Sequence, residues 1–140
     1  MSAGRICTRV VQTATAHEPV FDAARRMRDH HVGTLVVVDD DRRPIGIVTD
    51  RDLTVRCVAE GCNPANTHLS DVMTRVVSCV EEDTPIEAAL STMAAAKTRR
   101  MVVTGTDGRL EGVLSLDDVI DLLVEEAGTI GRLLRSQAPV

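Results

Sequence analysis

The chain has 140 residues, of which 44% are hydrophobic and 26% charged, and it carries a net charge of −5 at pH 7. With one Phe and neither Trp nor Tyr, it lacks both the basic surface and the aromatic platforms that nucleic-acid-binding proteins use. No apolar run approaches the ~20 residues that cross a bilayer, and the start, MSAGRICTRVVQ, has no apolar signal-peptide core. These properties predict a cytoplasmic globular protein that binds neither nucleic acid nor a membrane.

The sequence repeats itself after 66 residues. Residues 5–53 align with residues 71–119 without a gap, and 13 of the 49 positions are identical, where chance would give about three. Two copies at so long a period predict a pseudo-symmetric pair rather than a solenoid. The identical pairs include Thr8/Thr74, Pro19/Pro85, Met27/Met93, Gly46/Gly112 and Asp52/Asp118.

In chain order, each copy predicts a strand, a helix, two strands and a closing helix. The first strands are predicted at 10–14 and 76–80, and each following helix starts at a proline, whose missing N–H costs nothing in a first turn. In the second copy Thr84 and Glu87 have the spacing of a capping box. Apolar residues recur at i, i+3, i+4 and i+7, which predicts one helix face packed on a sheet. They are Val20, Ala23, Ala24 and Met27, then Ile86, Ala89, Leu90 and Met93.

The second strands, LVVVD at 35–39 and MVVTG at 101–105, are largely apolar, and we expect LVVV to be covered on both faces. Closing helices are predicted at 50–60 and 117–127, with Gly61 and Gly128 as stops. The predicted fold class is therefore α+β, built from tandem βαββα repeats. The expected units are repeat 1 at 5–60, a linker at 61–70, repeat 2 at 71–127 and a helical tail at 128–140.

The last predicted helix, VIDLLVEEA at 119–127, has apolar side chains in almost every direction, whereas a surface helix needs a single apolar stripe. We expect a second copy of the chain to cover the excess, and a two-fold homodimer is the commonest such assembly. The alternative is that the tail, IGRLLRSQ at 130–137, folds back over this helix.

One motif ends the third strand of both copies, as GIVTDRD at 46–52 and GVLSLDD at 112–118. One interpretation is helix capping, because a hydroxyl followed three residues later by an acid closes a helix start. The other is a nucleotide site, in which a helix N-terminus attracts an anion and a carboxylate accepts from ribose hydroxyls. The hydroxyls belong to Thr49 and Ser115, and the carboxylates to Asp52 and Asp118.

The glycine that begins each motif also bears on this choice. Gly46 and Gly112 stand inside apolar strands, where glycine weakens a sheet unless a backbone or a ligand must approach closely. Because the glycine, the hydroxyl and the acid recur together in both copies, the pattern favours the nucleotide site.

With the doubled βαββα unit, the G-h-h-[S/T]-x-x-D ending and DVMT at 71–74, residues 5–127 resemble a CBS domain pair, or Bateman module. The resemblance implies that Asp52 and Asp118 hold a ribose and that Thr49 and Ser115 lie near ribose and phosphate. It places adenine between apolar residues of the first and second strands. It also implies a regulatory module that binds AMP, ADP, ATP or S-adenosylmethionine between its repeats and commonly dimerises.

A basic pair that reaches phosphate often precedes the second strand in this family. Here Arg99 and Arg100 stand at that position, whereas the first copy has Gly33 and Thr34. The alternative is a solvated basic run with no ligand.

The chain departs from the family pattern at one point. The usual Met-Thr at the start of a repeat is present at 73–74 but reads Cys-Thr at 7–8, which bears on packing or the adenine slot there and leaves the ribose-binding pair untouched.

The four cysteines form no CxxC pair. Cys57, Cys62 and His68 could be imagined as metal ligands, but structural zinc normally needs four closely spaced ligands. We therefore expect free thiols and no metal site of their own. A magnesium ion could accompany a phosphate ligand at Asp50 and Asp52.

No GxSxG, HExxH, Walker or GxGxxG motif occurs, so we expect no enzyme and no obligatory cofactor. The leading hypothesis is a regulatory module that senses an adenosyl nucleotide and signals through a homodimer to a separate effector protein. The alternative is a ligand-free module for dimerisation and partner docking.

Overall fold

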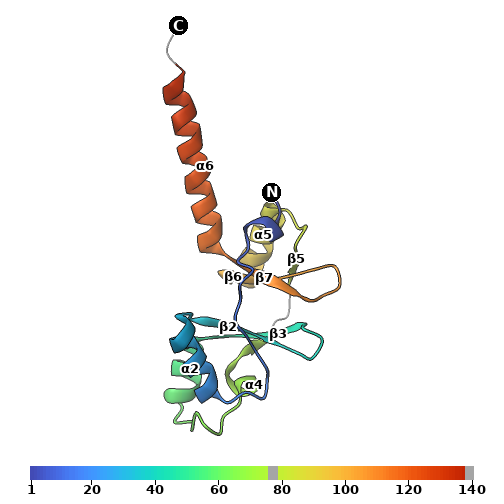
Figure 1. Ribbon diagram of the computed structural model, residues 1–140, viewed down its shortest axis with the longest axis vertical. Coiled ribbons are helices and arrows are strands. Elements are labelled where there is room, and N and C mark those ends of the chain that lie inside the picture. Colours follow the sequence, from blue (N-terminus) through green and yellow to red (C-terminus); the bar gives the residue numbers. More distant parts are fainter. Residues whose placement is uncertain (76–78, 138–140) are drawn as a thin grey trace.

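The computed structural model describes residues 1–75 and 79–137. Two β-sheets lie near the centre of the molecule, and helices cover the outer side of each (Figure 1). Repeat 1 forms the lower half of this view and repeat 2 the upper half, from which the last helix rises. This α+β architecture of two similar halves confirms the predicted fold class.

Repeat 1 follows the predicted order of elements. Its strand β1 runs parallel to β2, and β2 runs antiparallel to β3 with Val36 opposite Ile47. The predicted first strand at 10–14 is shorter than expected, because β1 has only two residues and Val10 is 89% exposed. The elements are β1 (Thr13–Ala14), α2 (Val20–His30), β2 (Thr34–Val38), β3 (Pro44–Thr49), α3 (Asp50–Leu53) and a π-helical turn, η1 (Thr54–Val58).

Repeat 2 has the same order and the same register. Val102 lies opposite Val113, as Val36 lies opposite Ile47 in repeat 1. Residues 76–78 of the predicted first strand lie outside the described residues. The elements are β5 (Val80–Glu81), α5 (Ile86–Ala96), β6 (Arg100–Thr104), β7 (Leu110–Ser115) and α6 (Leu116–Ser136).

Each repeat begins with a one-turn helix, α1 (Ala3–Ile6) or α4 (Leu69–Val72), that packs in the core of the other repeat, and the segment after it pairs with the sheet of that other repeat. Strand β4 (Thr74–Arg75) leads into repeat 2 but pairs antiparallel with β3 of repeat 1. Likewise Thr8 leads into repeat 1 but exchanges two backbone hydrogen bonds with Val113, at 2.9 and 3.0 Å. The crossing segments therefore join the two halves through backbone pairing.

Three apolar clusters account for the stacking of the layers. Leu35 and Val37 of β2 face the helices of repeat 1, and Met101 and Val103 of β6 face those of repeat 2. Val36 and Val102 point the opposite way and pack with Leu110 in a third cluster, which lies between the sheets. The prediction that LVVV would be covered on both faces is confirmed, since Leu35, Val36 and Val37 are fully buried.

The predicted capping box at Thr84 and Glu87 is wrong. Pro85 is the N-cap of α5 and no side chain caps this helix. The N-terminal segment takes over instead, because Ile86 N donates to the Met1 carbonyl at 3.1 Å and Ala3 N donates to the Thr84 carbonyl at 2.8 Å. Backbone from a distant segment thus satisfies Ile86 N at the start of α5, where no side chain caps the helix.

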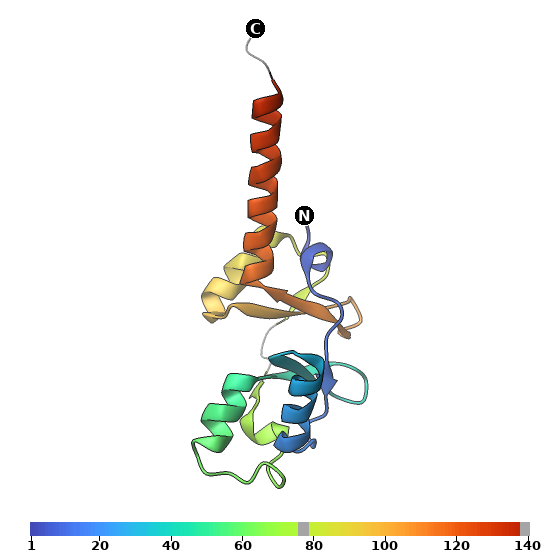
Figure 2. The same ribbon diagram turned by 60° about the vertical axis from the view of Figure 1, so that its left-hand side comes forward.

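The closing helices differ most from expectation. In repeat 1, helix α3 passes into the π-helical turn η1, which ends at Val58. In repeat 2, α6 continues through the predicted stop at Gly128 to Ser136 as one helix of 21 residues. The tail therefore does not fold back, and α6 extends beyond the rest of the chain in both side views (Figures 1 and 2). Within residues 1–75 and 79–137, no helix is both long and apolar enough to cross a membrane.

Candidate functional site

The two repeated motifs form the same local structure. Thr49 is the N-cap of α3, where its side chain accepts from Asp52 N at 3.2 Å and the Asp52 carboxylate accepts from Thr49 N at 2.9 Å. Ser115 and Asp118 make the reciprocal pair at the start of α6, at 3.0 and 3.2 Å. The capping interpretation is therefore confirmed for both copies.

Capping leaves part of each pair free for a ligand. The cap uses one carboxylate oxygen, Oδ2, of each aspartate. The other oxygen of Asp52 lies 3.8 Å from Arg56 Nε, and within the described residues Oδ1 of Asp118 has neither a hydrogen bond nor an ion pair. Each hydroxyl accepts one N–H and can still donate its own hydrogen. The Asp118 motif thus retains one acceptor and one donor for a further partner, whereas the second carboxylate oxygen of Asp52 is already ion-paired with Arg56.

The register of the strands gives the direction of these hydroxyls. Residues directly opposite each other in an antiparallel pair lie on the same face of the sheet. Thr49 lies two residues after Ile47 on β3, and Ser115 lies two residues after Val113 on β7, so each pair is on the same face of its sheet. Both Ile47 and Val113 pack into the cluster between the sheets. Thr49 and Ser115 therefore lie on the face of their sheet that is turned toward the other repeat.

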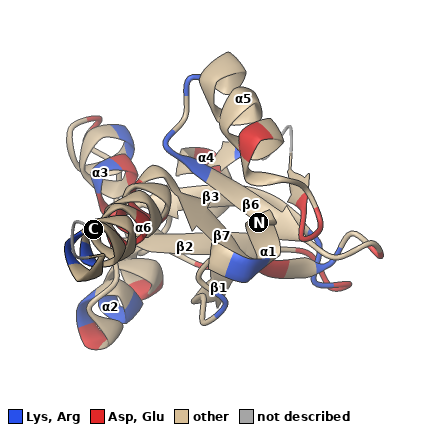
Figure 3. Ribbon diagram, turned by 90° about the horizontal axis from the view of Figure 1, so that it is seen from above, with Lys and Arg blue, Asp and Glu red and all other residues tan. Residues whose placement is uncertain are grey.

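The two motifs differ in the residues that stand opposite them. Arg100 is the register partner of Ser115, so these side chains share the inner face, whereas Thr34 is the partner of Thr49. Arg99 donates to Asp117 at 3.4 Å, and both of these side chains are largely exposed. The basic segment between α5 and β6 is drawn in blue in Figure 3. Positive charge thus stands on the strand opposite Ser115, whereas Thr49 faces the uncharged Thr34; the cation near the first motif is Arg56, which lies 3.8 Å from Asp52.

The two motif glycines accommodate the crossing segments. A Cβ on Gly112 would lie 2.5 Å from the Thr8 carbonyl oxygen, which is fixed by pairing with Val113. A Cβ on Gly46 would overlap Sδ of Met73, which is a flexible side chain. In both repeats the close approach comes from the chain itself, so the glycines are explained by packing without a ligand.

Cys7 also lies at the second motif. Its Sγ would be 2.9 Å from a Cβ on Gly112. Burial raises the pKa of the Cys7 thiol, and Arg9 offsets only part of this effect, while the negative charge of Asp118 raises the pKa further. The Cys-Thr at 7–8 that departs from the family pattern is therefore next to the Asp118 motif of repeat 2.

The expectation of free thiols is wrong for two of the cysteines. Cys57 and Cys62 form a disulfide, with their Cα atoms 4.9 Å apart, at the end of η1. The return of the chain after Val58, with Cys62 N donating to the Cys57 carbonyl, brings the two residues together. Cys7 and Cys79 are free. Among the described residues no three His, Cys, Asp or Glu side chains group as metal ligands.

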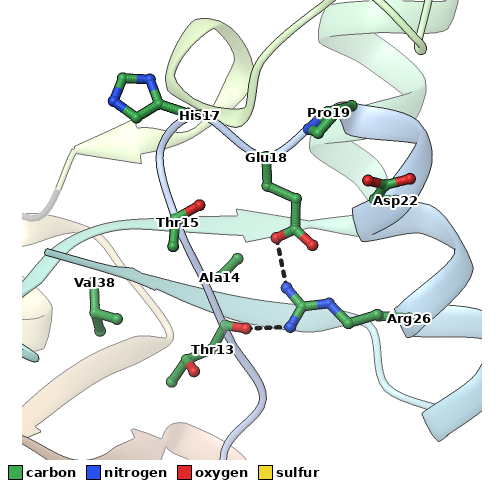
Figure 4. A pocket seen from close by; sticks show the side chains of 9 residues that line it. All are labelled: Thr13, Ala14, Thr15, His17, Glu18, Pro19, Asp22, Arg26 and Val38. Carbon is green, nitrogen blue, oxygen red and sulfur yellow. Dashed lines mark hydrogen bonds and ion pairs between the residues drawn. The ribbon is translucent and has the colours of Figure 1, made fainter. Parts of the chain in front are cut away.

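A pocket that the sequence did not predict lies at the other end of β2 from Thr34. It has a volume of about 420 Å³ and is lined by Thr13, Glu18 and Arg26, among others (Figure 4). Arg26 donates to the Thr13 carbonyl and to Glu18, while its Nε is buried without a hydrogen-bond partner among the described residues. The residues at the equivalent positions of Glu18 and Arg26 are Thr84 and Thr92, which explains why no repeated signal marked this pocket.

Comparison with known proteins identifies the family. Residues 3–58 and 69–125 match the CBS domain. The chain belongs to the CBS domain family. It is 33% identical over 122 residues to the uncharacterized protein MK0525 of Methanopyrus kandleri, covering 87% of this chain and 62% of MK0525. It is also 37% identical over 115 residues to the uncharacterized protein YlbB of Bacillus subtilis, covering 81% of this chain and 76% of YlbB.

Solved CBS structures share the fold. Hypoxic Response Protein I with two coordinated zinc ions has a TM-score of 0.76 and 28% identity, covering 86% of this chain and 98% of its own. The CBS domain pair of protein MJ0100 in complex with 5-methylthioadenosine and S-adenosyl-L-methionine has a TM-score of 0.77 and 21% identity, covering 90% and 98%. CBSX2 in complex with AMP has a TM-score of 0.76 and 23% identity, covering 89% and 97%. The last two resemble this CBS chain in fold alone.

Proposed function

We propose that this CBS domain pair is a cytoplasmic regulatory module that binds an adenosyl nucleotide between its two repeats. The observation that carries the proposal is the repeated hydroxyl–carboxylate pair: its hydroxyl residue lies on the inner face of each sheet at a helix start, and the cap does not use the second oxygen of its carboxylate. The MJ0100 and CBSX2 complexes with adenosyl compounds support the choice of ligand class.

In this proposal the Oδ1 atoms of Asp52 and Asp118, which the caps do not use, accept hydrogen bonds from ribose hydroxyls. Thr49 and Ser115 donate to a ribose or phosphate oxygen beside the positive end of the helix that each one caps. Charge-assisted hydrogen bonds of this kind contribute about 1.5–3 kcal/mol each. The carboxylates would thus be the principal source of affinity for the sugar.

The two sites would prefer different ligands. Arg100, and Arg99 once it leaves Asp117, would bind phosphate oxygens at the Ser115 site, because a guanidinium is a planar donor that matches phosphate. The Thr49 site has Thr34 and Gly33 at the equivalent positions and carries Asp50 beside them. It would favour an uncharged or cationic adenosyl compound, or a phosphate accompanied by Mg²⁺ at Asp50 and Asp52.

The signal would pass through a homodimer to a separate effector protein, with no catalytic step and no obligatory cofactor. Support for self-association comes from α6, whose apolar side chains are exposed along most of its length. Binding between the repeats would act on the dimer because Ser115 and Asp118 cap the helix that carries these side chains.

The test is calorimetric titration of AMP, ATP, methylthioadenosine and S-adenosylmethionine into the wild-type chain and its aspartate variants. Asp52→Ala combined with Asp118→Ala should weaken binding by about 10- to 150-fold at each site. Asp121→Ala is the matched control for α6, because it removes one exposed acid from the same helix without touching the cap. Unchanged affinity in the double variant would contradict the ribose assignment.

Because alanine also removes the caps, Asp118→Asn provides a second measurement. Asparagine keeps an acceptor at the helix start while it removes the charge, so the cap should hold and nucleotide affinity should still fall. A ligand-free docking module is the alternative function. It predicts no thermal stabilisation by any of the four compounds at millimolar concentration, whereas a ligand at 100 times its Kd should stabilise by about 2.7 kcal/mol.

A further inference from the structure

The Cys57–Cys62 disulfide joins the last turn of η1 to the segment that leaves it. Cys57 is fully buried in the core of repeat 1, and Cys62 packs against this core from a half-buried position. Their Cα atoms are 4.9 Å apart, and Cys62 N donates to the Cys57 carbonyl at 3.0 Å. The bond therefore fixes where the chain turns out of the closing helix of repeat 1.

The turn that this disulfide closes is π-helical, which is a rare geometry that is frequent at functional sites. In η1 the N–H of Ala59 donates to the Thr54 carbonyl, five residues earlier, at 2.9 Å. Repeat 2 provides the comparison, because Leu123 and Gly128 replace the cysteines and α6 passes through the equivalent positions as an α-helix. The wide turn thus accompanies the disulfide and is absent from the repeat that has none.

Arg56 lies inside η1 and connects this turn to the first repeated motif. Its Nε lies 3.8 Å from Oδ1 of Asp52, and its Nη1 donates to the Val72 carbonyl at 3.0 Å. The equivalent residue of repeat 2 is Leu122, and Oδ1 of Asp118 has no partner within the described residues. The carboxylate oxygen that a ribose would use is therefore paired with a cation in repeat 1 and not in the described part of repeat 2.

The register of η1 determines where the Arg56 side chain points. An α turn closes between residues four apart and a π turn between residues five apart, so a return to the α register would move Arg56 around the helix axis relative to Asp52. The disulfide is the covalent tie on the end of this turn. Opening it leaves backbone hydrogen bonds and two contacts of a half-exposed side chain, each of which contributes little. The pair of Arg56 with Asp52 would therefore loosen on reduction.

The disulfide can be opened from one side. A disulfide in a cytoplasmic protein is usually transient, and catalytic or redox-sensing pairs are the common cases. Cys57 is buried and Cys62 only half-buried, so a thiolate of a dithiol reductant would attack Sγ of Cys62. The S–S bond breaks, Cys57 leaves as a thiolate and takes up a proton, and the second thiol of the reductant then releases Cys62 in the same way. Two electrons and two protons pass to the protein, and the reductant becomes a disulfide.

We propose that reversible reduction of the Cys57–Cys62 disulfide by a dithiol regulates ribose binding at the Thr49 site through Arg56. This inference rests on the proposed nucleotide function and names the regulation of one of its two sites. With the disulfide closed, Arg56 stays beside Asp52 and competes with a ribose hydroxyl for Oδ1. With the disulfide open, that oxygen becomes available, and the ribose binds more tightly.

Calorimetric titration of methylthioadenosine into the full chain, oxidised or reduced with dithiothreitol, tests the proposal. Cys7→Ser and Cys79→Ser leave a single pair of cysteines, and Asp118→Asn weakens the other site. The reduced chain should bind about two- to fivefold more tightly than the oxidised chain, because the competing ion pair is half-exposed. Equal affinity in the two states overturns the regulation alone, whereas no binding in either state overturns both the regulation and the proposed function.

Two arginine variants test the route. Arg56→Leu gives repeat 1 the residue of repeat 2 and should bind the ligand equally well in both redox states. Arg51→Leu is the matched control, because it removes an exposed arginine of α3 outside this pair and should keep the two- to fivefold difference. A difference that survives Arg56→Leu, or that disappears in both variants, overturns the role of Arg56.

A measurement without ligand separates this local change from a general loss of stability. In a ¹⁵N-labelled chain the Nε–H resonance of Arg56 should shift on reduction. The Nε–H resonance of Arg26, which belongs to the same repeat and pairs with Glu18, should stay in place. A shift of both resonances, or of neither, contradicts a change that is confined to η1 and the first motif.

Discussion

The two repeats begin their closing helices with the same cap and then diverge. In repeat 1 the helix gives way after Leu53 to a π-helical turn that the Cys57–Cys62 disulfide closes. In repeat 2 the positions of these cysteines are occupied by Leu123 and Gly128, and the helix continues to Ser136. The two closing helices therefore begin with the same cap but end differently: the first ends at the core of repeat 1, and the second extends into solvent.

The same contrast holds in front of the caps. Repeat 1 presents Thr34 opposite Thr49, and repeat 2 presents Arg100 opposite Ser115. The backbone and the caps are equivalent, so the difference in ligand preference that we propose comes from a few side chains. The two repeats thus share the backbone and the cap of the site but differ in the charge of the residue opposite the hydroxyl.

Nucleotide affinity should change most when repeat 2 is given the residues of repeat 1. Arg99→Gly with Arg100→Thr should weaken AMP and ATP binding by about 10- to 150-fold, because charge-assisted bonds to phosphate are lost. Binding of methylthioadenosine, which has no phosphate, should change little. Calorimetric titration measures both, and Arg43→Thr with Arg109→Thr controls for the loss of two positive charges elsewhere.

The reverse change gives repeat 1 a residue of repeat 2. Thr34→Arg should tighten AMP binding at the Thr49 site and make it more sensitive to salt, since a new phosphate contact would be screened. Equal losses for AMP and methylthioadenosine in the Arg99/Arg100 variant would show that the arginines support the fold and not the phosphate.

A smaller difference is expected between the motif glycines. Gly112→Ala should lower the free energy of unfolding by about 1–3 kcal/mol, because its methyl group meets the paired backbone at Thr8. Gly46→Ala should cost less, because the methyl group meets Sδ of Met73, and an unbranched methionine can move aside. Urea unfolding measures both; a larger cost at Gly46 would contradict this account of the crossing segments.

The disulfide should matter to repeat 1 alone. Closing a six-residue loop stabilises by about 2 kcal/mol in the chain-entropy description. Cys57→Ser with Cys62→Ser should therefore lower the urea midpoint while leaving binding at the Ser115 site unchanged. Titration of the denatured wild-type chain with a thiol reagent should find the two free cysteines, Cys7 and Cys79. Four reactive thiols would show that Cys57 and Cys62 are not bonded to each other.

The smallest effect concerns the thiol beside the second motif. Because burial raises the pKa of Cys7, less thiolate is present at pH 7 than for an ordinary thiol, and the alkylation rate should rise as the pH increases through that pKa. Mass spectrometry after iodoacetamide labelling measures the rate, with glutathione in the same tube as reference. AMP should slow the labelling of Cys7, and an unchanged rate would place the nucleotide away from the Ser115 site.

Much of the fold could be predicted because periodicity and repetition are local signals. The α2 and α5 stripes and the apolar β2 strand are visible in single segments of sequence. The crossing of Thr8 to β7 and of β4 to β3 could not be predicted, because a two-residue pairing with a distant strand leaves no periodic pattern. The start of α5 was mispredicted for the same reason, because it is completed by the backbone of the distant residues 1–3 and not by a capping box of its own.

The site was predicted by type more than by arrangement. The spacing of Thr49 and Asp52 indicated either a cap or a ligand pair, and the cap turns out to use only one oxygen of each carboxylate. Gly128 was expected to end a helix because glycine often does, yet α6 continues through it to Ser136. Apolar residues recur at intervals of three and four on both sides of Gly128, at Leu123, Ala127, Ile130 and Leu134. Regular spacing over several turns was a stronger signal than the single breaker.

The crossing segments make the two halves mutually dependent. A fragment ending before Thr74 would leave β3 with an open edge, and one starting after Thr8 would do the same to β7. Neither half is therefore a self-sufficient folding unit, and exposed edges of this kind promote aggregation. A truncation or a domain exchange within this protein would therefore have to keep both halves together.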